Sequence, residues 1–270
     1  MADAYGKLTS RPQICFVTCG PAATDACHGV HIAIQVSTPM ILLIEQMDTG
    51  MRERGIFQEI AYKSMFGSMF KWVAKIDKAE RIPEFISSAF SVPLKDRPGT
   101  LVLSLPEDML TEMSTVADSP LIEPVVGAPS PAEMLRLVDE LARARRPLAI
   151  VGGSGWNVEG TNSFAQFAAP FGLPVARSFR RTSLFAATHP NYPGWIHRYH
   201  RYQQFARRLA PTNSSMDYGI HAAVMDNRQW PDKVVVCFED DGYFLMNGKE
   251  FATAVQYDET IIIIIAYNVQ

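Results

Sequence analysis

The chain has 270 residues, of which 47% are hydrophobic and 20% charged, a balance typical of a globular protein with a sizeable core. This composition excludes disordered, collagen-like and coiled-coil proteins. The formal net charge of −3 gives no overall attraction to nucleic acid or to an anionic membrane, so neither is an expected partner.

The cysteine content and the short apolar runs of the sequence bear on the cellular compartment and on membrane insertion. Four cysteines in a chain of this length do not form a disulfide framework, and the first residues lack the basic and apolar regions of a secretory signal. The most apolar run, at 260–266, is far too short to cross a bilayer. We therefore expect a cytoplasmic protein without a membrane span.

The first part of the chain alternates buried strands with helices. Residues 1–12 are polar and without a regular pattern, and a buried strand at 14–18 then runs into a turn at Cys19-Gly20-Pro21. Further elements are expected in the order helix 22–35, strand 40–44, helices around 57–70 and at 82–90, and strand 99–105. This alternation predicts an α/β fold, with parallel sheets flanked by helices.

A proline-rich stretch at 121–131 indicates a linker between domains. Beyond it we expect a helix at 131–144 and a strand at 147–151, which begin a second αβ unit, and after Phe179 an Arg- and aromatic-rich segment without a further strand. From Ser214 the pattern predicts a helix to about 226, a strand at 233–238, an acidic turn at 239–242, a helix to 257 and a strand at 260–266. The predicted domains are 1–120, 121–195 and 196–270.

Polar side chains follow the last two expected strands. Asp241-Gly242 comes after the first of them and Asn268 after the second. The carboxyl ends of parallel strands share one edge, so a carboxylate and an amide can meet there, and such oxygen ligands suit Mg²⁺. The alternative is an ordinary acidic surface turn, because Asp-Gly turns are common.

The same residues carry a family resemblance. The run 240–246 with Tyr267-Asn268 resembles the Gly-Asp-Gly to Asn-Asn motif of thiamine-diphosphate-dependent enzymes. The first region, through the segments 16–25, 37–42 and 57–59, is similar to the pyrimidine-binding domain of the acetolactate synthase group. Residues 147–192 resemble the start of that group's central domain, and 210–219 resemble the opening of its diphosphate-binding domain. The chain thus resembles the family along most of its length.

The resemblance implies thiamine diphosphate and Mg²⁺ as cofactors. Asp241, Asn268 and the backbone carbonyl of Gln270 would hold the metal, and Met216 would be the apolar wedge that keeps the cofactor bent, with a core methionine as the alternative. Phe57 and Gln58 would line the substrate side of the pocket, or otherwise form two faces of a helix. The full set of implied cofactor-binding residues is Gly20, Pro21, Ser214, Met216, Asp241, Gly242 and Tyr243.

Departures from the family pattern put activity in question. The chain is expected to lack the segment carrying the family's activating Glu, and part of the central and C-terminal regions. Asp240 stands where the motif has its first Gly, which adds a Cβ and a negative charge near a diphosphate. Asp25, Tyr267 and Asp217 also replace family residues. The alternative to an enzyme is therefore a non-catalytic shortened relative that serves as a binding or regulatory subunit, or an inactive remnant.

Other candidate sites are weaker. The turn 152–155, Gly-Gly-Ser-Gly, lies where the acetolactate synthase group contacts flavin, but many members hold none, so FAD is not the expected cofactor. Cys19, Cys27, His28 and His31 have ligand types for zinc without a zinc-site spacing. The Arg-, His- and Tyr-rich cluster at 197–208 could hold phosphate or RNA, although a solvated helix face is the simpler interpretation.

The resemblance defines the expected function. It implies decarboxylation and carboligation of small 2-oxo acids, with the cofactor supplying the chemistry and the protein orienting it. It also implies a homo-oligomer, a dimer or tetramer, because pyrimidine and diphosphate domains of different subunits meet around each cofactor in the family. A full-length paralogue that supplies the missing carboxylate is the alternative partner.

Overall fold

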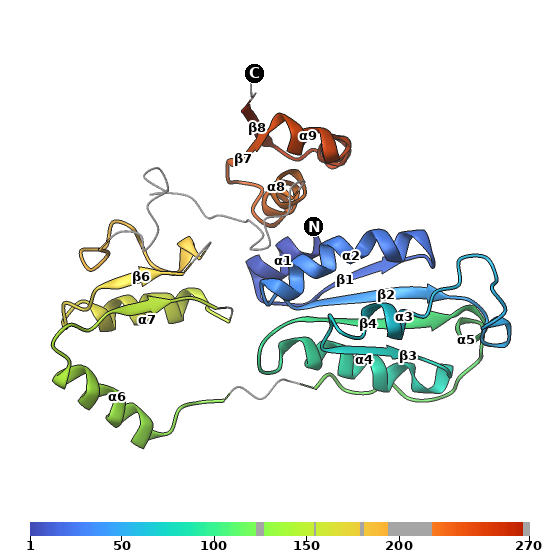
Figure 1. Ribbon diagram of the computed structural model, residues 1–270, viewed down its shortest axis with the longest axis horizontal. Helices are drawn as coiled ribbons and strands as arrows, with labels where there is room; N and C mark the ends of the chain where they lie inside the picture. The colour runs from blue at the N-terminus through green and yellow to red at the C-terminus, as the bar shows by residue number, and fades with distance from the viewer. Residues whose placement is uncertain (123–126, 154, 179–180, 194–217, 267–270) are drawn as a thin grey trace. The chain divides into compact units, whose positions relative to one another are not determined.

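A computed structural model of the chain describes residues 1–122, 127–153, 155–178, 181–193 and 218–266 (Figure 1). The chain divides into two compact units, one formed by Met1–Pro124 with Leu209–Gln270 and the other by Val125–Arg208. None of the helices in the described ranges combines the length and the apolar character that crossing a lipid bilayer requires.

The first unit contains a four-stranded parallel sheet (Figure 1). Its strands lie in the order β1 (Gln13–Val17), β2 (Met40–Gln46), β4 (Thr100–Pro106) and β3 (Trp72–Lys75). Every neighbouring pair is parallel, with β2 paired to β1 and to β4. The predicted α/β fold with parallel sheets and flanking helices is confirmed.

The two central strands are buried because apolar side chains emerge on both of their faces. In β2, Met40, Leu42 and Ile44 pack into one core cluster, whereas Ile41 packs into a second cluster on the opposite face. A continuous apolar run is what a parallel strand covered on both sides requires. The edge strand β1 is less covered, and the side chain of Phe16 is 60% exposed.

Helices cover both faces of this sheet. They are α1 (Ala2–Thr9), α2 (Pro21–Gln35), α3 (Tyr62–Phe66), α4 (Ile82–Ser91) and α5 (Glu107–Leu110), with 3₁₀ turns at Thr49–Met51, Ala79–Arg81 and Val92–Leu94. α2 and α4 match the expected helices. The expectation of a featureless opening is wrong, since residues 2–9 are helical, and β3 was not foreseen.

The expected helix at 57–70 is also wrong, because only Tyr62–Phe66 is α-helical there. Backbone conformation explains the difference, because Gln58 has a positive φ, which interrupts a right-handed helix; Glu53 and Gly55, just before it, also have positive φ. The carboxylate of Glu59 accepts hydrogen bonds from the backbone N–H groups of Glu53, Gly55 and Ile56. Residues 53–59 therefore form a loop held together by the Glu59 carboxylate, and the next residue, Ile60, is bonded to Gln46 at the end of β2.

The C-terminal part of the same unit is a smaller α/β element. It contains α8 (Gly219–Gln229), β7 (Val235–Asp240), α9 (Asp241–Asn247), a 3₁₀ turn at Gly248–Glu250, α10 (Phe251–Gln256) and β8 (Ile261–Ala266). β7 and β8 form a parallel pair. The expected acidic turn at 239–242 is wrong, since β7 continues through Asp240 and α9 begins at Asp241.

A buried polar network joins α1 to the start of α8. The hydroxyl of Tyr218 donates to Oδ2 of Asp3 at 2.7 Å, and Nζ of Lys7 donates to the Tyr218 oxygen at 3.1 Å. Lys7 also forms an ion pair with Asp3 at 2.7 Å. Burial, together with the negative charge of Asp3, raises the pKa of Tyr218 well above its ordinary value. Ala4, Ile32 and Ala222 pack around the network.

The second unit contains α6 (Pro131–Arg143), β5 (Ala149–Val151), α7 (Val158–Ala168), β6 (Val175–Arg177) and a 3₁₀ turn at Thr182–Leu184. β5 and β6 are parallel neighbours. Ser130 and Glu133 form a capping box at the start of α6, which explains why the predicted helix begins there. Residues 111–122 and 127–130, around the predicted linker, form neither helix nor strand.

Candidate functional site

The carboxyl-terminal edge of the four-stranded sheet gathers polar and strained residues. Gly20 ends the turn after β1 with a φ of 63°, and Pro21 opens α2 as its first residue. The N–H of Gly20 donates to the hydroxyl of Tyr62 at 3.0 Å. A Cβ on Gly20 would lie 2.7 Å from the Cβ of Gln58, so only glycine fits at this position.

The structure brings Gln58 to the Gly20 turn but leaves Phe57 in solvent. Oε1 of Gln58 accepts from the thiol of Cys19, with a sulfur to oxygen distance of 3.2 Å. The Phe57 side chain is 80% exposed. Both residues lie in the loop before α3, so the interpretation as two faces of a helix is wrong, while their role toward a substrate stays a prediction.

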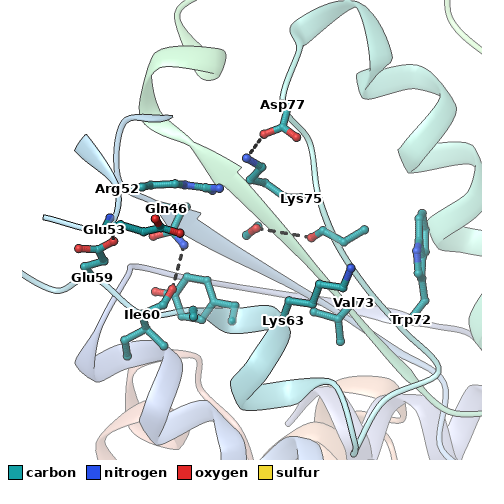
Figure 2. A pocket seen from close by; sticks show the side chains of 14 residues that line it. Gln46, Arg52, Glu53, Glu59, Ile60, Lys63, Trp72, Val73, Lys75 and Asp77 are labelled. Carbon is teal, nitrogen blue, oxygen red and sulfur yellow. Dashed lines mark hydrogen bonds and ion pairs between the residues drawn. The ribbon is translucent and has the colours of Figure 1, made fainter. Parts of the chain in front are cut away.

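A pocket of about 550 Å³ lies next to this turn (Figure 2). It is bounded by the end of β2, by β3, by Ser104 of β4, by the loop 52–61 and by the first residues of α3. The Nε2 atom of Gln46 donates to the carbonyl of Ile60 at 3.0 Å and so ties the loop to β2. Fourteen residues line the pocket, and Tyr62 belongs both to its wall and to the Gly20 contact.

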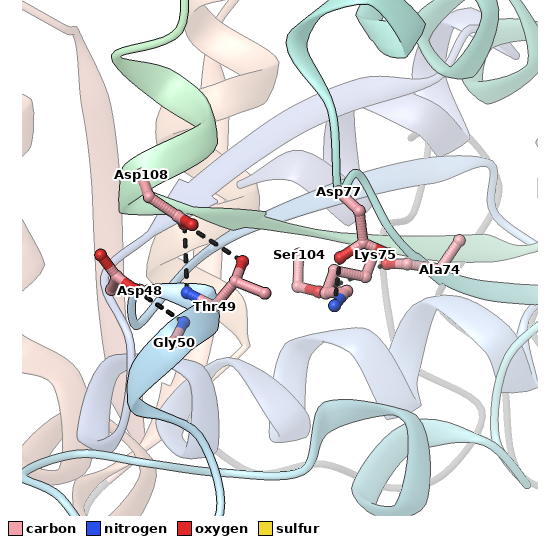
Figure 3. A network of polar contacts seen from close by, with 8 residues as sticks. All are labelled: Asp48, Thr49, Gly50, Ala74, Lys75, Asp77, Ser104 and Asp108. Atoms are coloured by element: carbon pink, nitrogen blue, oxygen red, sulfur yellow. Dashed lines mark hydrogen bonds and ion pairs between the residues drawn. The ribbon is translucent and has the colours of Figure 1, made fainter.

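A polar network stiffens the same edge of the sheet (Figure 3). The carboxylate of Asp108, just after β4, accepts from the backbone N–H and the hydroxyl of Thr49, both at 3.2 Å. The side chain of Asp48 accepts from the N–H of Gly50 at 2.7 Å and caps the 3₁₀ turn that follows β2. Desolvation acts to raise the pKa of Asp108, but the hydrogen bonds that its carboxylate accepts, from Thr49 and from the backbone of Asp108 and Met109, together outweigh it and the pKa is lowered.

The second set of implied residues lies at the end of β7. The register pairs Asp240 with Ala266, so the last residues of β7 and β8 lie side by side at one edge of the sheet. Asp241 is half-buried at the first position of α9, and Gly242 is exposed behind it. A carboxylate at this point has the oxygen chemistry that Mg²⁺ prefers, so the described part of the donor set fits the metal.

A buried acid beside this edge was not foreseen. Glu239 is 5% exposed, and its Oε1 accepts from the N–H of Ile220 at the start of α8 at 3.2 Å. Gly219 makes room for this carboxylate, because a Cβ there would lie 2.0 Å from Oε1. Burial and the neighbouring Glu239 raise the pKa of Cys237 to about 12. The alternation of inward and outward residues along β7 is the signal that could have placed Glu239 inside.

Other implied residues fall outside the described part of the chain. They are Ser214 and Met216, Asn268 and Gln270, and the side chain of Tyr243. In the second unit, Gly152 follows β5 as expected, and its carbonyl accepts from the indole N–H of Trp156 at 2.9 Å. Among the described residues, no group of three or more His, Cys, Asp or Glu side chains has the arrangement of a metal centre.

Three family models of thiamine pyrophosphate enzymes match this chain. The N-terminal TPP binding domain matches residues 1–65, the central domain residues 134–210, and the C-terminal TPP binding domain residues 190–270. The chain belongs to the thiamine pyrophosphate enzyme family. The two TPP binding domains carry the Gly20 turn and Asp241 respectively, and they support thiamine diphosphate as the cofactor.

Curated relatives place the chain near the acetolactate synthases of this family. It is 27% identical over 203 residues to the acetolactate synthase large subunit of Haemophilus influenzae, covering 73% of this chain and 35% of that protein. It is 28% identical over 205 residues to a probable acetolactate synthase large subunit of Methanococcus aeolicus, covering 72% and 34%. The Escherichia coli isozyme 3 large subunit is 26% identical, covering 73% and 35%. The chain spans about a third of the length of these relatives.

Proposed function

We propose that the protein binds thiamine diphosphate with Mg²⁺ and acts on small 2-oxo acids, by decarboxylation and carboligation of the acetolactate synthase type. The observation that carries the proposal is the parallel β7–β8 pair, which places Asp241 at the shared carboxyl edge inside a matched TPP binding domain. When bound, the cofactor supplies the electron sink for loss of CO₂ from the 2-oxo acid.

The proposed roles fall on residues at two sheet edges, the carboxyl edge of the β7–β8 pair and that of the four-stranded sheet. Asp241, with Asn268 and the carbonyl of Gln270, would hold Mg²⁺ against the diphosphate, and Met216 and Ser214 would position the aminopyrimidine and thiazolium rings. Gly20 and Pro21 would bound the pyrimidine side. Gln58, held by Cys19, presents its amide beside the Gly20 turn, where it would orient a substrate, and Phe57 would shield the reacting groups from water.

Domain limits, assembly and compartment belong to the same proposal. The domains would be a pyrimidine-binding domain at 1–120, a partial central domain at 121–195 and a partial diphosphate-binding domain at 196–270. A homo-oligomer, or an oligomer with a full-length paralogue, would bring the two TPP binding domains of different chains together. All four cysteines are free thiols, which supports a reducing compartment such as the cytoplasm.

The test is a calorimetric titration of the purified chain with thiamine diphosphate, with and without Mg²⁺. We expect Mg²⁺-dependent binding that Asp241→Ala abolishes and Asp232→Ala leaves unchanged, because Asp232 is an exposed residue before the opposite end of β7. Size-exclusion chromatography of the same samples reports the oligomer. A folded chain that binds no cofactor under either condition would overturn the proposal.

A competing proposal is a non-catalytic subunit. The observation in its favour is Asp240, which places a second acidic residue beside Asp241 where the family motif has glycine. Assaying consumption of pyruvate by the cofactor-loaded chain separates the two: the enzyme turns over alone, whereas the subunit binds cofactor without turnover. Asp240→Gly is expected to tighten cofactor binding under either proposal, because it removes a like charge near the diphosphate.

A further inference from the structure

The two faces of the parallel β7–β8 pair are covered very differently (Figure 1). Side chains alternate between the faces along each strand. One face packs against α8, α9 and α10, and its core residues are Val235, Cys237, Ile261 and Ile263. The outer face, on the opposite side, consists of large apolar side chains that are between 44% and 76% exposed: Val234, Val236, Phe238, Ile262 and Ile264.

The side chains of the outer face form one continuous patch. The register places Val236 beside Ile262 and Phe238 beside Ile264, so apolar groups of the two strands lie next to each other. The outward positions from Val234 to Phe238 and from 260 to 264 include no charged residue. Single exposed apolar side chains are ordinary on protein surfaces, whereas a contiguous apolar patch marks a contact surface.

The chemistry of the outer face suits a second copy of itself. An apolar sheet face packs well against another sheet face, and a two-fold axis between two copies makes the same patch self-complementary. Because the patch carries no charge, no like-charge repulsion opposes this pairing, whereas a partner with a polar surface would be desolvated without compensation. Covering the five side chains on both copies removes roughly 1,000 Å² of surface from water, which reaches the lower limit for a specific interface.

We propose that two copies of the chain dimerise by packing the outer faces of their β7–β8 pairs against each other, with Phe238 near the centre of the contact. This interface goes beyond the proposed function. It joins two copies of the same C-terminal element, whereas the oligomer expected from the cofactor joins two different TPP binding domains. None of its five residues is among the implied ligands of thiamine diphosphate or Mg²⁺, so the dimer forms without either.

The experiment is analytical ultracentrifugation of the full chain over a range of micromolar concentrations, without thiamine diphosphate or Mg²⁺. Phe238→Asp and Ile264→Asp each place a charge in the contact. Phe171→Asp is the matched control, because Phe171 is 58% exposed and belongs to the second unit. We expect a monomer–dimer equilibrium whose dissociation constant rises roughly tenfold or more with either outer-face variant, since a charge would be buried unpaired. Phe171→Asp should leave it unchanged.

A mixing experiment separates direct contact from a general loss of structure. Phe238→Asp and Phe238→Lys should each be monomeric and folded by circular dichroism, and mixing them should restore a dimer, because opposite charges then meet across the interface. A folded wild type that stays monomeric would overturn the proposal, since the face is then covered from within the chain or left exposed. Equal weakening by Phe171→Asp, or no dimer on mixing the two folded variants, would overturn it as well.

Discussion

Gly20 and Gln58 are the residues whose identities constrain each other most directly. Both have a φ of 63°, and a Cβ on Gly20 would lie 2.7 Å from that of Gln58. We predict that Gly20→Ala destabilises the fold by about 1–3 kcal/mol, because it combines a strained backbone with overpacking. Adding Gln58→Gly removes the clashing atoms and is expected to restore part of the loss. Urea denaturation of the single and double variants measures this coupling.

Gly29 provides the control for that experiment. It lies within α2, and a Cβ there would meet no atom within 4 Å. Gly29→Ala should therefore stabilise the protein by about 0.5–1 kcal/mol, because alanine has the higher helix propensity. If both alanine substitutions changed the free energy of unfolding in the same direction, the argument from the Gly20 geometry would be wrong.

The buried thiol of Cys237 predicts a loss of stability in alkali. Its pKa rises from 9.0 to about 12 through burial and the neighbouring Glu239. A raised pKa in the folded state means that stability is complete below about pH 9 and falls as the pH rises from there toward 12. Cys237→Ala should reduce the slope of unfolding free energy against pH in this range. Cys27→Ala, at a thiol with a smaller shift, should reduce it less.

Individual site residues were predictable only where a motif fixed them. Asp241 follows β7 as the motif implied, and the Gly20 turn follows β1 as the apolar run before it indicated. The inward position of Glu239 was missed, because a run of acidic residues suggests a surface turn until the strand is known to continue through it.

At the scale of elements, Asn227 connects α8 to the residues just before the two strands of the C-terminal sheet. Its Oδ1 accepts from the N–H of Thr260 at 2.9 Å, and its Nδ2 donates to the carbonyl of Lys233 at 3.4 Å, while the side chain is 2% exposed. We predict that Asn227→Ala costs about 1–3 kcal/mol, because two backbone groups lose their hydrogen bonds to a buried side chain. Hydrogen exchange of the β7 and β8 amides measures the effect. The substitution Asn247→Ala, on α9, should not increase exchange in these strands to the same extent.

Apolar runs made the central strands predictable, whereas short or mixed segments did not. β2 and β4 were foreseen because both faces of each strand are buried, which produces unbroken hydrophobic sequence. β3 consists of four half-buried residues that include a lysine. The residues that α1 buries are Asp3, Ala4 and Gly6, which do not form an apolar stripe that the sequence would reveal. The loop at 57–61 was expected to be helical because its apolar residues have helical spacing. That spacing does not reveal the positive φ of Gln58, which prevents a helix there.

At the scale of the whole molecule, Tyr218 links parts of the chain that are 215 residues apart in sequence. Tyr218→Phe keeps the ring but removes the hydroxyl that Asp3 and Lys7 contact, so a buried carboxylate loses a hydrogen bond. We predict a loss of about 1–3 kcal/mol in the free energy of unfolding. Faster proteolysis between the sheet and α8 is expected as well. Tyr257→Phe is the control. The Tyr257 side chain is 50% exposed, and its contact with the guanidinium of Arg228 is made by the ring, which phenylalanine keeps.

The same long separation sets an order of events during folding. β7 and β8 are neighbours joined only by short helices and turns, so their pairing closes a short loop and costs little chain entropy. The contact of α1 with α8 closes almost the whole chain, and contacts of that kind form slowly. Before it forms, Ile32 and Ala222 lack the packing partners that they have in the native cluster. A folding intermediate with native strands and an unformed joint is the expected kinetic signature of this topology.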